Sequence, residues 1–89
     1  MPTSESISTA IELLTFITDP ATPAESHTGR LVDIGTRDAD TVDGRLDNII
    51  DLSVGLATVA QWLLLEREKW SGVTPAESLQ EVARLNLGG

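Results

Sequence analysis

The segment 42–65 constrains the fold most, because it begins as a one-sided amphipathic helix and becomes apolar on every side. Apolar residues recur in it at the helical spacings of three, four and seven, namely Val42, Leu46, Ile49, Leu56, Ala60 and Leu63. From Leu52 onward the opposite face is apolar as well, through Val54, Trp62 and Leu65. A helix that is apolar all round has to be covered, and a chain of 89 residues has little material to cover it. The segment therefore predicts self-association or burial against another protein.

Chain length and composition support the same expectation. Eighty-nine residues predict one domain spanning 1–89, and a domain of this size buries only about 60–65% of its unfolded surface. Small domains gain stability from disulfides, metals or oligomerisation. The chain has no cysteine and one histidine, so neither a disulfide nor a Cys/His zinc site is expected. We expect no cofactor and no metal, and we expect oligomerisation to supply the missing stability.

The net charge of −8 limits the classes of partner that the chain can bind. Fourteen acidic residues against six basic ones disfavour direct contact with nucleic acid, and they disfavour anionic membrane surfaces for the same reason. A basic protein partner stays open. So does the simpler interpretation that acidic chains are soluble chains.

The apolar stretch 48–65 is not expected to cross a membrane. Its uninterrupted part, 52–65, has 14 residues, which is short for a bilayer and typical of a buried core helix. The N-terminus lacks the basic region of a signal peptide, so we expect a cytoplasmic protein. Five arginines against one lysine favour a source with a GC-rich genome, and we expect a bacterial or phage protein.

Local signals predict a first helix over 4–18 and a last helix over 75–86. Thr3 or Ser4 can cap the first helix, and Asp19-Pro20 ends it. Five apolar residues share one of its faces, while Phe16 points away from that face: Ile7, Ala10, Ile11, Leu14 and Ile17. The pentapeptide Thr-Pro-Ala-Glu-Ser occurs at both 22–26 and 74–78. Each copy has the form of a capping box with proline at the first helical position, and predicts a helix start.

Between these helices, the sequence leaves the conformation of one segment undecided and predicts a long helix for the other. The segment 23–37 is either a short helix or a loop with one helical turn, because Gly29 and Gly35 each cost about 1 kcal/mol in a helix interior. The long helix is expected over about 40–70, with Asp40 as its N-cap and Gly72 just beyond its end. Its length of roughly 42–45 Å exceeds the diameter of roughly 26–30 Å expected for a compact domain of this size.

These elements predict an all-α fold, a small helical bundle built on one long central helix with shorter flanking helices. Two copies are expected to pair through the central helices, with antiparallel helices favoured. Tryptophan is a favoured interface anchor, and small residues let a second helix approach closely. The candidate interface for a second copy or another protein is Leu46, Ile49, Ser53, Leu56, Ala60, Trp62, Leu63 and Trp70. Two alternatives stay open: the tryptophans pack in an ordinary core, and the first helix packs on the small residues around Gly55.

A second candidate surface is acidic. If 33–51 were helical throughout, one face opposite the apolar residues would carry Asp33, Asp40, Asp43, Asp47 and Asp51. Such a face either docks a basic partner or is simply solvated, with its aspartates near a helix N-terminus where the dipole favours them. The segment 38–44 does not fit a calcium loop, since the glycine comes one position late and position 12 holds Ile49.

No catalytic signature is present in the sequence. The lone His27 has no nucleophile arranged beside it, and a capping or surface role is expected for it. The glycines are scattered singles and do not form a phosphate-binding loop. We therefore expect a non-enzymatic interaction or regulatory protein. The alternatives are an acidic inhibitor of a basic nucleic-acid-binding protein, in the manner of a DNA mimic or antitoxin, and a structural subunit of a larger assembly such as a virion.

Overall fold

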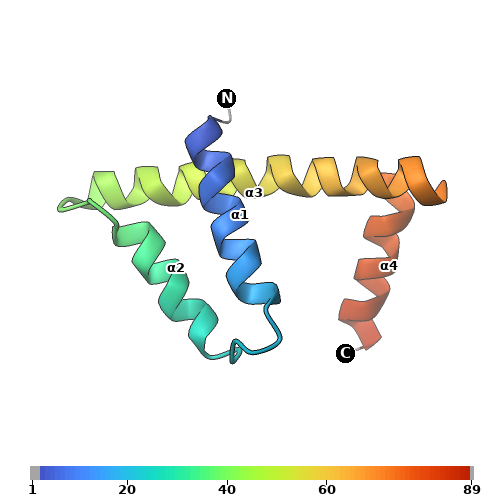
Figure 1. The fold of residues 1–89 in the computed structure, drawn as a ribbon, viewed down its shortest axis with the longest axis horizontal. Coiled ribbons are helices and arrows are strands. Elements are labelled where there is room, and N and C mark those ends of the chain that lie inside the picture. The colour runs from blue at the N-terminus through green and yellow to red at the C-terminus, as the bar shows by residue number, and fades with distance from the viewer. Residues whose placement is uncertain (1–2, 89) are drawn as a thin grey trace. The chain divides into compact units, whose positions relative to one another are not determined.

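The fold is all-α and contains one long helix, as the sequence predicts. A computed structural model describes residues 3–88 and has the helices α1 (Ser4–Thr18), α2 (Ser26–Thr36), α3 (Val42–Ser71) and α4 (Pro75–Gly88) (Figure 1). Contacts within the chain define two compact units, Met1–Val59 and Ala60–Gly89, here called the N-terminal and C-terminal units. Helix α3 runs through the boundary between them. The single domain and the completion of the bundle by oligomerisation stay predictions.

Helix α1 has the bounds expected from the sequence, and Thr3 caps it. The Thr3 Oγ1 accepts from the Ser6 backbone N–H at 3.0 Å, while the Ser6 Oγ accepts from the Thr3 N–H at 2.9 Å. This reciprocal pair satisfies two of the N–H groups that a helix leaves without partners at its start. Asp19, the residue before Pro20, is extended and ends the helix.

The two copies of the repeated pentapeptide behave differently. At the second copy, Thr74 Oγ1 accepts from the Glu77 N–H at 3.2 Å and Glu77 Oε1 accepts from the Thr74 N–H at 3.3 Å, which confirms the capping box. At the first copy the prediction was wrong. Helix α2 begins only at Ser26, its N-cap Glu25 makes no capping hydrogen bond, and the preceding residues form a turn. Of the two possibilities for 23–37, the structure contains the short helix.

The start of α3 also differs from the expectation. Thr41 Oγ1 accepts from the Gly44 N–H at 3.0 Å, so Thr41 caps the helix and Asp40 does not. At the other end Gly72 has a φ of +77°, the left-handed conformation in which a glycine commonly follows a helix. That end was predicted correctly.

The hydrophobic core of the N-terminal unit lies where α1 and α2 meet the first part of α3 (Figure 1). It consists of five buried residues, with Ile7, Leu14, Ile17 and Leu56 packed against it: Ala10, Leu13, Ile34, Leu52 and Val59. The predicted face of α1 was partly wrong, because Ile11 is 50% exposed and Leu13 is buried in its place. The buried face of α1 is centred on Ser6, Ala10 and Leu13.

The crossing of α1 over α3 depends on Gly55. A Cβ atom on Gly55 would lie 2.8 Å from the Ser6 carbonyl carbon and 3.2 Å from the Ala10 Cβ, and closer still to the Ser6 carbonyl oxygen. Only a residue without a Cβ permits so close an approach of two backbones. At Gly55 the structure therefore decides between the two open alternatives, since the first helix occupies the site.

Polar contacts hold α4 to α3 within the C-terminal unit. Arg67 donates from Nη1 to the Ser78 Oγ at 3.1 Å, and its Nη2 pairs with Glu81 Oε2 at 3.0 Å. Ser78 is only 2% exposed. No apolar side chain is buried among residues 60–88, and four large ones along α4 are exposed: Leu79, Val82, Leu85 and Leu87.

Candidate interaction surface

Most large apolar side chains of this chain face solvent. Among residues 3–88, fifteen large hydrophobic residues are exposed, whereas five apolar residues are buried. Helix α3 is long and apolar enough to cross a membrane, with a mean hydropathy of 1.5 over 18 residues, of which 17% are buried. This is weak evidence about location, because core helices of soluble proteins meet the same criteria. Within the isolated chain α3 is mostly uncovered, and its burial by a partner stays a prediction.

Four of the predicted interface residues lie in the N-terminal unit. Leu46 and Ile49 are each 52% exposed, Ser53 is exposed, and Leu56 is half-buried against the core. They form a stripe on α3, roughly a quarter of a turn around the helix from the side that packs on α1. Whether a partner covers this stripe stays a prediction.

An apolar groove lies between α2 and this stripe. It has a volume of about 480 Å³. Its lining includes Leu31, Val32 and Gly35 of α2 and Ile49, Ser53 and Leu56 of α3, and its one charged residue is Arg45. Gly35 faces Ile49 across the groove, since a Cβ there would meet Ile49 Cγ1 at the ordinary contact distance of 3.5 Å. Sequence reasoning missed Leu31 and Val32 as surface residues, although the spacing of 28, 31, 32 and 35 along one helix face is the signal that identifies them.

The other four predicted residues lie in the C-terminal unit, where all are exposed. Trp62 is 53% exposed, Leu63 62% and Trp70 76%, and Ala60 is also exposed. Trp70 Nε1 donates to Glu66 Oε1 at 2.6 Å. The alternative of ordinary core packing for the tryptophans does not hold in the isolated chain.

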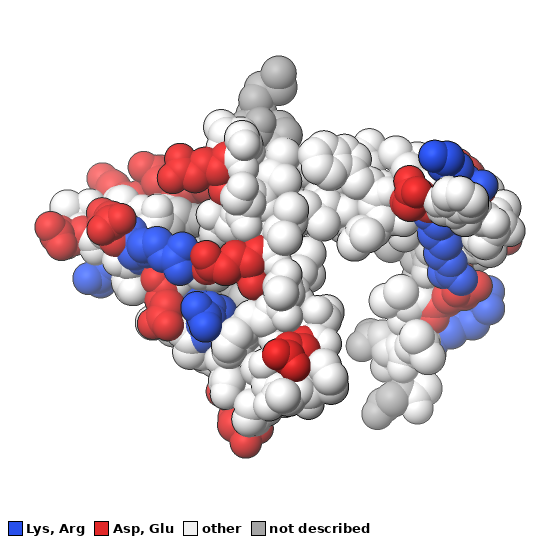
Figure 2. Space-filling model, in the orientation of Figure 1, with Lys and Arg blue, Asp and Glu red and all other residues white. Residues whose placement is uncertain are grey.

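The acidic residues do not share one helix, which corrects the expectation of a continuous stripe. The chain leaves the helical conformation between α2 and α3, where Asp38 has a φ of +53°. Asp33 therefore lies on α2 and Asp40 lies before α3, while Asp43, Asp47 and Asp51 lie on α3. All five predicted residues are exposed. Figure 2 shows acidic side chains spread over the N-terminal unit, with basic side chains lying among them.

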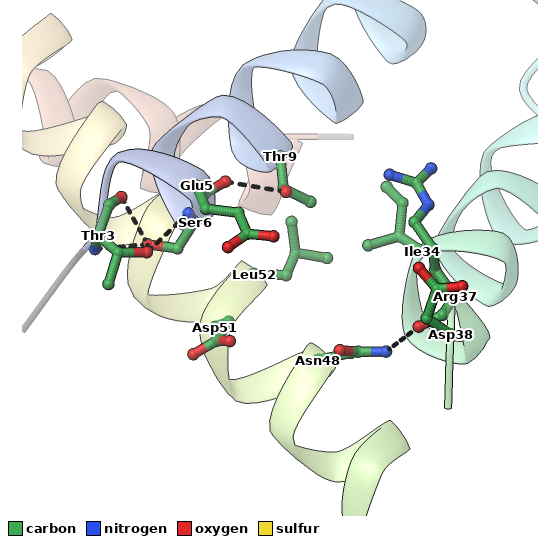
Figure 3. Close-up of a pocket in the computed structure, with 10 residues that line it drawn as sticks. All are labelled: Thr3, Glu5, Ser6, Thr9, Ile34, Arg37, Asp38, Asn48, Asp51 and Leu52. Atoms are coloured by element: carbon green, nitrogen blue, oxygen red, sulfur yellow. Dashed lines mark hydrogen bonds between the residues drawn. The ribbon is translucent and has the colours of Figure 1, made fainter. Parts of the chain in front are cut away.

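A polar cleft of about 230 Å³ lies beside these acids in the N-terminal unit (Figure 3). Its wall includes Glu5, Arg37 and Asp51. Asn48 Nδ2 donates to the Gly35 carbonyl at 3.1 Å and to the Arg37 carbonyl at 2.9 Å, so its amide satisfies the end of α2. Within residues 3–88 no group of three acidic or histidine side chains is placed to hold a metal ion. The amide of Asn48 and the guanidinium of Arg37 are thus held by other groups of the chain.

An ion pair joins α1 to the end of α2. Arg37 donates to both carboxylate oxygens of Glu12, at 2.9 and 3.3 Å. The hydrogen bond from Arg37 lowers the pKa of Glu12 below its usual value, and Glu12 in turn raises the pKa of Arg37. Both side chains are nearly half exposed, so water screens the pair and its contribution to stability is small.

Phe16 and His27 form a second contact between α1 and α2. Their rings meet edge to face, with centroids 6.4 Å apart, and the Arg30 guanidinium carbon lies 4.3 Å from the Phe16 ring centroid. Phe16 therefore meets the surface of α2. The His27 Nε2 is buried without a hydrogen-bond partner. His27 thus packs between the helices, which corrects the expectation of a capping or surface role.

No family model, curated protein or solved structure matches this chain. The structure alone therefore defines the class of this protein, which is a small acidic all-α protein with a long, mostly uncovered helix.

Proposed function

We propose that this chain is a non-enzymatic interaction protein that binds protein surfaces through the apolar side chains of its helices. One observation carries the proposal: exposed large apolar residues outnumber the buried ones among residues 3–88. Contiguous apolar surface beyond a few hundred Å² is rare on soluble monomers and marks sites of interaction. The function is that of a small regulatory or assembly component in a bacterium or phage, acting in the cytoplasm.

The mode of binding follows from the shape of the N-terminal unit. An apolar groove beside a helix is the usual receptor for the apolar face of another helix. The groove between α2 and α3 presents a surface that is almost wholly apolar, so it supports this mode. Asp43, Asp47 and Asp51 are on the side of α3 away from the groove, where they would steer the approach of a basic partner without taking part in the apolar contact.

Affinity capture from the source cell tests the proposal with two neighbouring variants. Leu46→Glu places a charge on the apolar stripe, whereas Asp47→Asn changes a charge on the acidic side of the same helix turn. We expect Leu46→Glu to lose at least one protein partner that the wild-type chain and Asp47→Asn retain at high salt. A set of captured proteins that Leu46→Glu leaves unchanged would contradict the proposal.

The acidic inhibitor is the second candidate. It is supported by Asp43, Asp47 and Asp51, which are exposed and make no ion pair within the part of the chain that the structure describes. An inhibitor of this kind binds a basic protein with an affinity that falls steeply with salt. In that case Asp47→Asn, and not Leu46→Glu, would lose the partner. A virion subunit, the third candidate, would instead show a concentration-dependent fold when isolated.

A further inference from the structure

We propose that the groove between α2 and α3 is the contact surface of a homodimer, and that the first turns of α3 from the second copy fill it. This inference rests on the proposed function and names the partner as a second copy of the chain. It assigns a place to the self-association that the sequence predicts only in general terms. Its support comes from the shape, charge and area of the surface.

The surface is self-complementary in shape. The groove contains Ile49 and Ser53, and next to it on the same side of α3 stand Val42 and Leu46, which are 78% and 52% exposed. A two-fold interface uses the same patch on both subunits, so each patch must contain both the ridge and the hollow. Ser53 is small and leaves room along α3 for a larger side chain from the other copy. With α3 helices antiparallel, the Val42–Leu46 ridge of each copy faces the Ser53 end of the other groove.

The distribution of charge permits two acidic copies to meet here. The chain carries a net charge of −8, so most surfaces of two copies repel each other. The acids of α3, at Asp43, Asp47 and Asp51, lie roughly 120–160° around the helix from Ile49. Arg45 is the one charged residue that lines the groove. The groove is therefore a surface on which two copies can pack without opposed carboxylates, and it offers no acidic side chain to a basic partner.

Summed over both units, the chain exposes more area than a protein of its mass that is fully folded on itself. The chain exposes 6597 Å², whereas a monomeric protein of 9.5 kDa exposes about 5,000 Å² when fully folded on itself. The difference of roughly 1,500 Å² is about twice the 800 Å² that each partner contributes to an interface of standard size.

Two adjacent isoleucines provide a matched test. Ile49 and Ile50 are 52% and 49% exposed, but they point about 100° apart around α3, and only Ile49 lines the groove. We expect the wild-type chain to have twice the mass of 9.5 kDa in light scattering after size exclusion. Ile49→Glu should raise the dimer dissociation constant about 30-fold or more, because it would place a carboxylate inside the apolar contact, where Arg45 is the one charged residue of the groove. Ile50→Glu should change that constant by less than about threefold.

A second variant covers the case in which Ile49→Glu fails to fold, because Ile49 also contacts α2 near Gly35. Leu31 lines the groove from α2 and is 44% exposed, so Leu31→Glu should leave the helices formed and still produce monomers. Circular dichroism on each sample reports whether the helices are retained.

Three results would overturn the inference. The first is a wild-type chain that stays monomeric at about 100 µM, a concentration far above the micromolar dissociation constants of ordinary specific complexes. This result would overturn the homodimer even if another protein or a lipid surface were found to occupy the groove. The second is a dimer unaffected by Leu31→Glu, and the third is a folded dimer that Ile50→Glu disrupts as strongly as Ile49→Glu. If a wild-type monomer still captured a partner that Leu46→Glu loses, the proposed function would stand and only the homodimer would be wrong.

Discussion

Replacing Gly55 by alanine should destabilise the N-terminal unit, although the same change usually stabilises a helix. Alanine in a helix interior is favoured over glycine by about 1 kcal/mol. At Gly55, however, the new Cβ would lie 2.8 Å from the Ser6 carbonyl carbon, a distance that real Cβ atoms do not show. The obstacle is backbone, so a change of side-chain rotamer cannot relieve it and α1 must move away from α3.

The expected size of the effect follows from these two opposed contributions. Overpacking in a well-packed interior costs about 1–3 kcal/mol, and a backbone obstacle belongs at the upper end of that range. After the gain in helix propensity, we expect Gly55→Ala to lower the free energy of unfolding by about 1–2 kcal/mol. For a chain of this size that corresponds to a fall of roughly 5–15 °C in Tm.

Gly29→Ala is the matched control. Gly29 also lies inside a helix, and a Cβ there would have no atom within 4 Å. Gly29→Ala should therefore raise the free energy of unfolding by about 0.5–1 kcal/mol, the difference in helix propensity between alanine and glycine. Urea unfolding followed by circular dichroism at one fixed protein concentration measures both variants, since self-association would make stability depend on concentration. If Gly55→Ala proves as stable as Gly29→Ala, the close crossing of α1 and α3 is wrong.

Three further predictions concern local interactions. Glu12→Gln should lower the free energy of unfolding by about 0.5 kcal/mol at pH 7. Because Arg37 lowers the pKa of Glu12, the ion pair stabilises the fold above the ordinary carboxyl pKa of 4.5, and this stabilisation is lost as the pH falls below that value. In urea titrations between pH 7 and 3, the variant should therefore lose less stability than the wild-type chain. His27→Phe should raise the free energy of unfolding by about 1 kcal/mol, because it keeps the ring contact and removes a buried nitrogen that has no partner; a loss of stability in urea would show that this nitrogen is hydrogen-bonded. Thr74→Ala should cost about 1 kcal/mol by removing the cap of α4, and unchanged helicity and Tm by circular dichroism would refute that role.

The sequence predicted those parts of the fold that depend on neighbouring residues. The caps at Thr3 and Thr74 and the glycine after α3 are local devices, and each was found at the expected place. The first copy of the repeated pentapeptide shows where local reasoning fails. It has the same five residues as the second copy, but it follows the turn at Asp19-Pro20, and the chain enters α2 only at Ser26.

The candidate surfaces depended more on tertiary structure, and the sequence predicted them less well. Helical spacing identified Leu46 and Ile49, but it could not show that Leu31 and Val32 of α2 would complete a groove with them. Small residues around Gly55 predicted a close helix crossing without identifying α1 as the helix. The predicted acidic stripe requires one continuous helix over 33–51, but the chain is not helical between α2 and α3, so Asp33 lies on α2.

The contact between Ser6 and Gly55 also has a consequence for synthesis of the chain. These residues lie 49 positions apart, so the contact has a larger loop-closure entropy than the one between Arg67 and Ser78, which are 11 apart. At roughly 5–20 residues per second, a ribosome needs about 2–8 s to extend the chain from Thr18 to Val59. Throughout that interval α1 has been made but its packing surface on α3 has not. The nascent chain therefore exposes the apolar face of α1 to chaperones and to other chains before it can fold.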